Sequence, residues 1–215
     1  MITVTLIGAG NVAQHLYRAF STSDKVHVCQ WFNRHLDTIQ KYKNEVDITD
    51  DISSLKEADI YIIAVSDDAI ANISKKLPFT NKLVLHTSGS VNMHHLDKKN
   101  HRGVFYPLQT FTKGADLNFE DVPICIEVEQ RSDYGIVKKL AIAIGFLNVA
   151  FLTPIGIALG VIAGAIALIY TNSRNATEYT DKFKKSLEEI RDMRFGETYE
   201  GLDNVLNTEK TQNAS

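Results

Sequence analysis

The sequence predicts an α/β protein in which a doubly wound, mostly parallel sheet is followed by an apolar helix and a charged helical tail. Three observations lead to this fold class. β-Branched apolar runs alternate with segments of helical period over residues 1–140, a pattern typical of parallel sheets covered by helices on both faces. A glycine-rich turn separates the first apolar run from the first helical segment. Charged residues then disappear near residue 146, where a long uncharged stretch begins.

The first half of the sheet is predicted from apolar runs bounded by turn residues. These runs occupy residues 2–7, 26–32, 45–49 and 60–65. Between them, apolar side chains that recur with helical spacing predict helices over 12–20, over 53–58 with Ser53 as N-cap, and from Ser66 to the residue before Pro78.

The second half of the sheet continues the same alternation. Strands are predicted in "KLVLHTSGS", in "GVFYPLQTF" up to Pro107 and in "VPICIEV". A helix is predicted in "DYGIVKKLAIAIG" and ends at Gly145. We therefore place one α/β domain over residues 1–145 and a helical C-terminal segment over residues 146–215.

Composition restricts the classes of function. The 215 residues carry a net charge of -3, which argues against nucleic acid as the main partner because such binders usually present a basic face. The two cysteines, Cys29 and Cys125, lie in apolar strand-like contexts, and no export signal precedes the first strand, so we expect buried thiols in the cytoplasm. The seven histidines are scattered, so we expect no metal site.

The glycine-rich turn "GAGNVA" at residues 8–13 fits the dinucleotide-binding pattern between a strand and a helix. Gly8 permits the tight turn, Gly10 lets the backbone approach a pyrophosphate, and Ala13 lets the helix pack closely on the strands. Free N–H groups at the helix start would attract the phosphates. The alternative is a glycine turn that serves packing alone.

The end of the second strand indicates which dinucleotide is preferred. NAD binding calls for Asp or Glu about 20 residues after the glycine motif, where it would accept hydrogen bonds from the ribose hydroxyl. This chain has Asn33 and Arg34 there, and a guanidinium can pair with a 2′-phosphate. NADP is therefore favoured over NAD, although Asp37 is close by in sequence. Alternatively, Arg34 is an ordinary solvated surface residue.

Polar residues at the other strand ends are expected to line the same crevice, because ligands of such sheets lie outside the carboxyl ends of the strands. Ser88 is a plausible hydrogen-bond donor to a substrate, and His86 either exchanges a proton or is a satisfied histidine in a turn. We expect capping to explain Asp67 and Asp68. The residues at these strand ends are Ala64, Val65, Ser66, His86, Ser88, Ser90, Tyr106, Gln109 and Thr110.

Four stretches together, "IGAGNVAQHL", "YIIAVSDDAI", "LHTSGS" and "GVFYPLQTF", resemble a family of bacterial Rossmann-like proteins. These are NADP oxidoreductases of the deazaflavin-dependent type with a C-terminal helical domain of unknown function, distantly similar to pyrroline-5-carboxylate reductases and β-hydroxyacid dehydrogenases. The resemblance covers residues 1–140, with the motifs in family order, and does not settle the substrate.

The resemblance implies NADP binding through the glycine turn and the Asn33–Arg34 pair, with Ser66 near the nicotinamide. It also implies a substrate cleft lined by His86, Ser88 and Gln109, of which the first two are the catalytic candidates. Together with the strand-end argument, the expected cofactor contacts are Gly8, Ala9, Gly10, Asn11, Val12, Asn33, Arg34, Ala64, Val65 and Ser66.

The C-terminal segment departs from that family, whose Rossmann domain is followed by amphipathic helices that close the cleft and commonly build a dimer. Instead, an apolar helix is predicted over 151–170, a charged helix over 178–194, and a polar tail after it. The apolar stretch resembles apolar helices of phage tail tape-measure proteins. Its length and its glycines at intervals of four suit a membrane span, and burial against the sheet or in a dimer is the alternative.

Three functions remain open from the sequence. The first is an NADP-dependent oxidoreductase that transfers a hydride to or from a small imine or a keto or hydroxy acid. The second is a nucleotide-binding module without catalysis, because the closing domain is replaced. The third is a membrane-anchored or assembly protein in which the α/β part is a scaffold, with association through residues 151–170.

Overall fold

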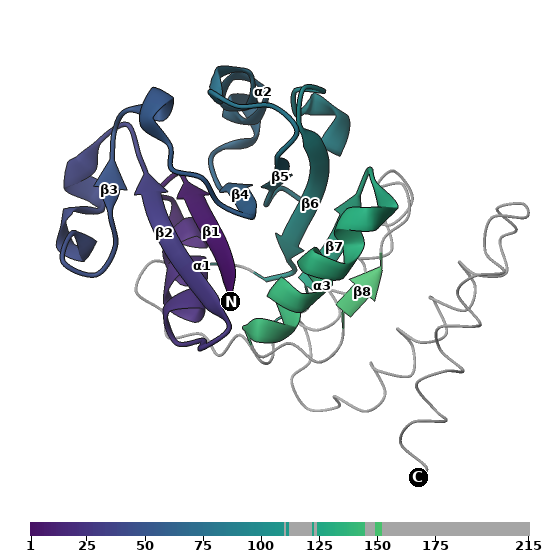
Figure 1. Cartoon of the computed structure of the whole chain (residues 1–215), viewed down its shortest axis with the longest axis horizontal. Helices are drawn as coiled ribbons and strands as arrows, with labels where there is room; N and C mark the ends of the chain where they lie inside the picture. Colours follow the sequence, from purple (N-terminus) through teal and green to yellow (C-terminus); the bar gives the residue numbers. More distant parts are fainter. Residues whose placement is uncertain (110, 112–121, 123, 145–148, 152–215) are drawn as a thin grey trace, which may run out of the picture. The chain divides into compact units, whose positions relative to one another are not determined.

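The computed structural model describes residues 1–109, 111, 122, 124–144 and 149–151 (Figure 1). These residues build one twisted sheet flanked by helices. Its eight strands are β1 (Ile2–Ile7), β2 (Val26–Phe32), β3 (Ile48–Thr49), β4 (Ile60–Ile63), β5 (Leu83–His86), β6 (His101–Pro107), β7 (Ile124–Val128) and β8 (Val149–Phe151).

The strands lie in the order β3-β2-β1-β4-β5-β6-β7-β8. From β3 to β6 all neighbouring strands are parallel. β7 then pairs antiparallel with β6, and β8 runs parallel to β7. The predicted doubly wound, mostly parallel Rossmann sheet is therefore confirmed, with a reversed pair of strands at one edge.

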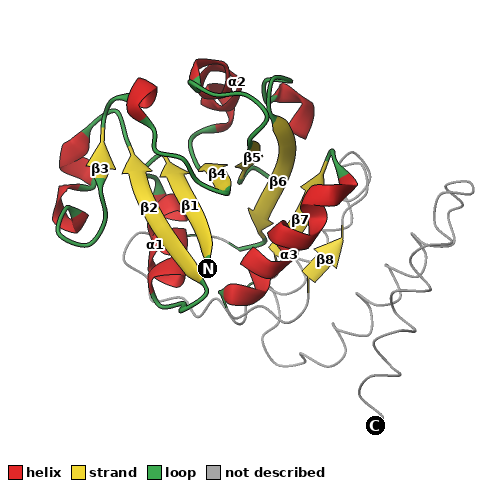
Figure 2. Ribbon diagram, in the orientation of Figure 1, coloured by secondary structure: helices red, strands yellow, loops and turns green. Residues whose placement is uncertain are grey.

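Helices cover both faces of the sheet (Figure 2). On one face, Leu16 and Phe20 of α1 (Asn11–Ser21) and Leu140 of α3 (Tyr134–Ala143) share a hydrophobic cluster with strand residues such as Leu6. On the other face, α2 (Asp67–Lys76) adds Ile70 to a second cluster that includes Ile63. Burying each of these side chains stabilises the fold by about 1.5–3 kcal/mol.

The helix predicted over 53–58 is wrong. The chain forms a single 3-10 turn, η3 (Ile52–Ser54), whose N-cap is Asp51 rather than Ser53, and the backbone becomes extended at Leu55. Side chains of the neighbouring strands satisfy the backbone that follows. Lys56 N–H donates to Gln30 Oε1, and the Tyr61 hydroxyl donates to the carbonyl of Lys56 while it accepts from Ala58 N–H. A helix over 53–58 would have had to break these three bonds, of which the one to Gln30 joins residues 26 positions apart.

The compact unit that contains the sheet extends over Met1–Ile155. The predicted boundary at residue 145 does not enclose the whole sheet, because β8 lies after it. Phe151 is the last residue of β8, whereas the sequence predicts it as the first residue of an apolar helix over 151–170. The rest of that helix, the charged helix over 178–194 and the polar tail lie outside the described residues. Across the residues that are described, no helix is long and apolar enough to cross a membrane.

Both cysteines lie on strands as predicted. Cys125 is buried in β7, whereas Cys29 in β2 is only partly buried, and both are free thiols. Burial raises the pKa of the Cys125 thiol to about 12. The Cys125 sulfur therefore stays protonated and is not poised for nucleophilic chemistry.

Candidate functional site

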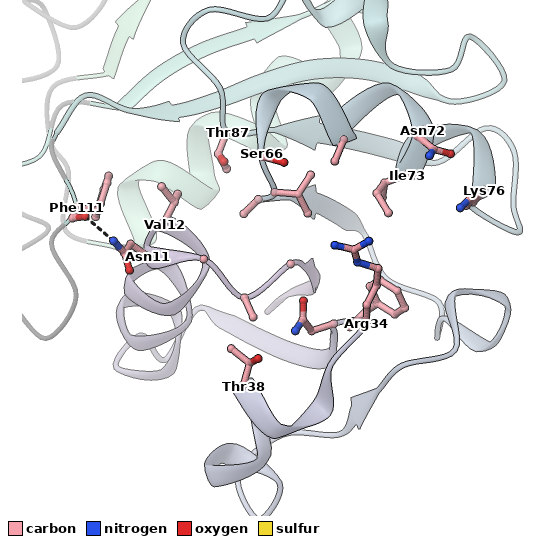
Figure 3. Close-up of a pocket in the computed structure, with 18 of the residues that line it drawn as sticks. Asn11, Val12, Arg34, Thr38, Ser66, Asn72, Ile73, Lys76, Thr87 and Phe111 are labelled. Atoms are coloured by element: carbon pink, nitrogen blue, oxygen red, sulfur yellow. Dashed lines mark hydrogen bonds between the residues drawn. The ribbon is translucent and has the colours of Figure 1, made fainter.

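A cleft of about 650 Å³ opens at the carboxyl ends of the strands, within the ~300–1,000 Å³ typical of small-ligand sites (Figure 3). It lies where β1 and β4 are neighbours in the sheet while the helices that follow them, α1 and α2, pack on opposite faces. Such a switch point leaves a crevice between the diverging connections. Residues that follow five strands, β1, β2, β4, β5 and β6, all contribute to its wall.

The turn after β1 can be built only with glycine at its first position. Gly8 has φ of 109°, and a Cβ there would lie 2.3 Å from the carbonyl oxygen of Ala64. The turn is held on both sides, because Gly8 N–H donates to Phe32 O at 2.9 Å and the Trp31 indole N–H donates to Gly8 O at 2.6 Å. The sheet thus fixes the backbone from which α1 starts.

Gly10 leaves the floor of the cleft open. It is the N-cap of α1, and no heavy atom outside its chain neighbours lies within 4 Å of where a Cβ would stand. Gln14 N–H already donates to Gly10 O at 3.1 Å, so the helix begins directly after it. The first-turn N–H groups have no partner inside the helix, and no acidic residue lies in that turn. The geometry is that of an anion-binding helix start.

The charged groups that line the cleft are cations. Arg34, after β2, and Lys76, the last residue of α2, are the charged members of the described lining, and no carboxylate belongs to it. Asp37 lies in the 3-10 turn η1 (Leu36–Thr38) without lining the cleft, whereas Thr38 does line it. In a chain with net charge -3 this is a local reversal of sign, and it favours an anionic ligand.

His86 and Ser88 are close to the cleft and do not line it. His86 is fully buried, and burial lowers the pKa of its imidazole to about 4. Its Nδ1 accepts from Ser88 N–H at 3.2 Å, and Nε2 has no hydrogen-bond partner among the described residues. The Ser88 hydroxyl accepts from the N–H groups of Ser90 and Val91, both at 3.1 Å. Both side chains thereby shape the loop after β5.

That loop is tied to the start of α2. The Ser90 hydroxyl donates to Asp67 Oδ2, and Asp67 and Asp68 occupy the first turn of α2. Ser66 is the N-cap residue, without a hydrogen bond from its side chain to the helix. The predicted helix start is therefore in place, and Ser66 is left to line the cleft.

The segment after β6 reaches the start of α1. Asn11 Nδ2 donates to the carbonyl of Phe111 at 2.9 Å, and the rings of His15 and Phe111 are 5.2 Å apart. Phe111 lines the cleft together with Gln109 and Val12 (Figure 3). This contact joins residues a hundred positions apart and closes one end of the cleft.

The residues expected to contact a cofactor come together in this cleft. All ten of them, and Gln109 of the expected substrate residues, line it. Reasoning from sequence missed the contribution of α2, although Ala69, Asn72, Ile73 and Lys76 follow the i, i+3, i+4, i+7 spacing of one helix face. Reasoning from sequence also named His86 and Ser88 rather than Thr87, which lies between them and lines the cleft. Which of these neighbours faces the cleft depends on the direction of each side chain. The other lining residues that were missed are Phe32, Thr38 and Phe111.

Residues 3–88 match the family model described as NADP oxidoreductase, coenzyme F420-dependent. No curated protein matches the chain. Among solved structures, the chain is similar to a Bacteroides fragilis protein described as a candidate NADP oxidoreductase, with a TM-score of 0.66 and 22% identity over 100% of this chain and 80% of that one.

Two dehydrogenases share the fold at lower identity. The prephenate dehydrogenase of Aquifex aeolicus, solved with hydroxyphenyl propionate and NAD+, gives a TM-score of 0.61 and 16% identity over 99% of this chain and 97% of that one. Synechocystis arogenate dehydrogenase gives a TM-score of 0.60 and 16% identity over 87% and 74%. Residues 3–88 of this chain therefore match that family model, and they lie in a Rossmann fold that the chain shares with these solved structures.

Proposed function

We propose that this protein binds NADP(H) in the cleft and acts as an NADP-dependent oxidoreductase on a small imine or on a keto or hydroxy acid. The observation that carries the proposal is the pairing of an open helix start at Gly10 with a cleft whose charged lining is cationic. The cofactor, when bound, supplies the hydride, and the protein supplies binding, orientation and electrostatics.

The residues present fit a dinucleotide at three points. The N–H groups after Gly10 suit the pyrophosphate, since a Cβ there would point into space left free by the protein. Arg34 suits a 2′-phosphate, because a planar guanidinium can donate two parallel hydrogen bonds to it. Thr87 and Gln109 follow β5 and β6, which lie on the other side of β1 and β4 from β2 in the sheet, so these two residues suit the nicotinamide and the substrate.

The choice of NADP over NAD rests on the absence of a carboxylate from the described lining of the cleft. A ribose with two free hydroxyls is normally held by Asp or Glu after the second strand. Asn33 stands there, and its Nδ2 donates to the carbonyl of His35 at 2.9 Å. Asp37, the acid nearest in sequence, is not part of the lining.

A nucleotide-binding module without catalysis is the second candidate, and the environment of His86 favours it. An imidazole whose pKa is lowered to about 4 by burial is neutral at physiological pH and cannot donate a proton from a cationic form. The Ser88 hydroxyl is engaged in its own loop. In this alternative the cleft binds the dinucleotide and no proton donor completes the reaction.

A titration of the purified full-length chain tests the proposal. The single tryptophan, Trp31, hydrogen-bonds to the glycine turn, so its emission should fall by energy transfer when NADPH binds. We expect NADPH to bind at least about tenfold more tightly than NADH, and Arg34→Ala to remove most of that difference, because hydrogen bonds between charged groups contribute about 1.5–3 kcal/mol. Absence of binding by both dinucleotides would overturn the proposal.

Turnover separates the two candidates. Oxidation of NADPH is followed with an imine, a keto acid and coenzyme F420 as acceptors, the last because the matched family model names it. Turnover of any of these supports the oxidoreductase. Tight NADPH binding with no turnover of any acceptor supports the non-catalytic module.

A further inference from the structure

Two cations from different parts of the chain stand at one end of the cleft. Arg34 follows β2, and Lys76 ends α2, 42 positions later in the sequence. Figure 3 shows both at the end of the cleft that lies away from Phe111 and Thr87, with the Arg34 side chain directed toward α2. We propose that Lys76 is a second specificity-determining residue, which together with Arg34 binds the 2′-phosphate of NADP. This inference rests on the proposed function.

Neither cation forms an ion pair within the part of the chain that the structure describes. The four ion pairs found there involve Lys56, Lys82, His101 and Arg102, and all of them lie away from the cleft lining. No carboxylate contributes to the described lining. A dianionic phosphate that enters between Arg34 and Lys76 would therefore gain two opposite charges without displacing an existing ion pair.

Lys76 lies at the carboxyl end of α2, where the helix dipole would repel a phosphate unless another positive charge offsets it. Lys99 provides that charge. The carboxyl end of a helix carries a partial negative charge, which repels a phosphate. Lys99 Nζ donates to the carbonyl of Lys75 at 3.0 Å and to the carbonyl of Leu77 at 2.7 Å. Lys99 thereby offsets the partial negative charge at the end of α2, which leaves the Lys76 ammonium available to a phosphate in the cleft.

The neighbouring Lys75 provides a matched comparison. Both lysines are exposed and lie in the last turn of α2. Lys76 shares the cleft-facing stripe with Asn72 and Ile73, whereas Lys75 is not part of the lining. Since one residue advances a helix by about 100°, the two side chains leave the helix in different directions. If only the net charge mattered, replacing either lysine would weaken phosphate binding equally. A specific site predicts that only the replacement of Lys76 weakens it.

The experiment compares two adenosine ligands by calorimetry, so that no turnover is needed. Adenosine 2′,5′-bisphosphate carries the 2′-phosphate, and adenosine 5′-monophosphate lacks it. We expect Lys76→Ala to weaken the bisphosphate about tenfold and the monophosphate less than about twofold, as for loss of one charge-assisted hydrogen bond. Lys75→Ala should change neither ligand by more than about twofold, and Lys76→Arg should retain most of the affinity.

The outcomes separate this inference from the proposed function. Equal effects of Lys76→Ala and Lys75→Ala on the bisphosphate, or equal weakening of both ligands by Lys76→Ala, would overturn the role of Lys76 while NADPH binding by the wild type stands. Failure of the wild type to bind either NADPH or the bisphosphate would overturn the proposed function itself. Thermal unfolding of each variant shows whether a loss of binding reflects a loss of folded protein.

Discussion

The indole N–H of Trp31 donates a hydrogen bond of 2.6 Å to the carbonyl oxygen of Gly8, and both groups are buried. This bond joins the end of β2 to the turn after β1. The Trp31 ring also stacks on Tyr17 of α1, with ring centroids 4.6 Å apart. One side chain therefore fixes both the turn and the helix whose first residues line the cleft.

Replacing Trp31 by phenylalanine tests that relationship. The substitution keeps an aromatic ring and leaves the Gly8 carbonyl without its buried donor, so we expect the free energy of unfolding to fall by about 1–3 kcal/mol. NADPH affinity should fall as well, because the turn loses its anchor. Urea unfolding followed by circular dichroism measures the first effect, since the variant has no tryptophan.

Tyr17→Phe is the control for Trp31→Phe. It keeps the stacked ring and removes a hydroxyl that donates to Glu45 Oε2 at 3.2 Å in a partly buried position. We expect a change below about 1 kcal/mol. If Trp31→Phe is no more destabilising than Tyr17→Phe, the bond to Gly8 does not hold the turn.

The two glycines of the turn should respond differently to substitution. Gly8→Ala places a Cβ 2.3 Å from Ala64 O at a positive φ, so we expect a loss of about 3 kcal/mol in the free energy of unfolding. Gly10→Val adds a side chain where the protein leaves open space, at φ of -68°. It should change folding by only about 1 kcal/mol and weaken NADPH about tenfold or more.

Parallel urea unfolding and NADPH titration of these two variants separate the fold from the site. The Gly10 variant is the decisive one. A folded Gly10→Val protein with unchanged NADPH affinity would mean that the phosphates do not lie over the start of α1.

Thr87 tests the orientation of the dinucleotide. Its side chain lines the cleft, the residue is 7% exposed, and its N–H donates to Ile63 O at 3.2 Å, which a substitution of the side chain leaves in place. Thr87→Val should weaken NADPH about 2- to 10-fold, as for one neutral hydrogen bond, and leave adenosine 2′,5′-bisphosphate unchanged. Calorimetry with both ligands makes the comparison.

The exposed Thr80→Val is the matched control for Thr87→Val. It makes the same chemical change outside the cleft, so neither ligand should bind differently. Weakening of the bisphosphate by Thr87→Val would place the adenosine at the β5 end of the cleft and reverse the proposed orientation.

Acid should destabilise the fold through His86. Its pKa is about 4 in the folded protein and 6.5 ordinarily, so protonation favours the unfolded chain. The neutral His86 imidazole contributes fully to the free energy of unfolding above pH 6.5. This contribution is lost as the pH falls toward 4, by up to about 3 kcal/mol for this shift in pKa. His86→Asn keeps an acceptor for Ser88 N–H and removes the titration, which should flatten this part of the stability curve.

The free energy of unfolding measured between about pH 6.5 and 4.5 checks the role of His86. His27→Asn, at an exposed position of β2, is the control and should keep the slope of the wild type. A wild-type slope in His86→Asn would show that other groups cause the acid sensitivity.

Local pattern was sufficient for most of the fold. β-Branched runs and helical spacing predicted β1, β2, β4, α1 and α2 because each signal lies within a few consecutive residues. The same reasoning failed at residues 53–58, where Gln30 of β2 accepts a hydrogen bond from the backbone N–H of Lys56, 26 positions later in the sequence. No local signal shows that such partners exist.

The glycine turn could be predicted without a structure, because its strand, its helix start and its glycine spacing are all local and only glycine tolerates the required backbone. Which other side chains share the cleft depends on the folded arrangement of the whole domain. It brought Arg34, Lys76 and Phe111 to the same cleft and turned His86 into the interior. The physical reason is that a binding site depends on the direction of side chains across a sheet edge, which is set by packing between segments far apart in the chain.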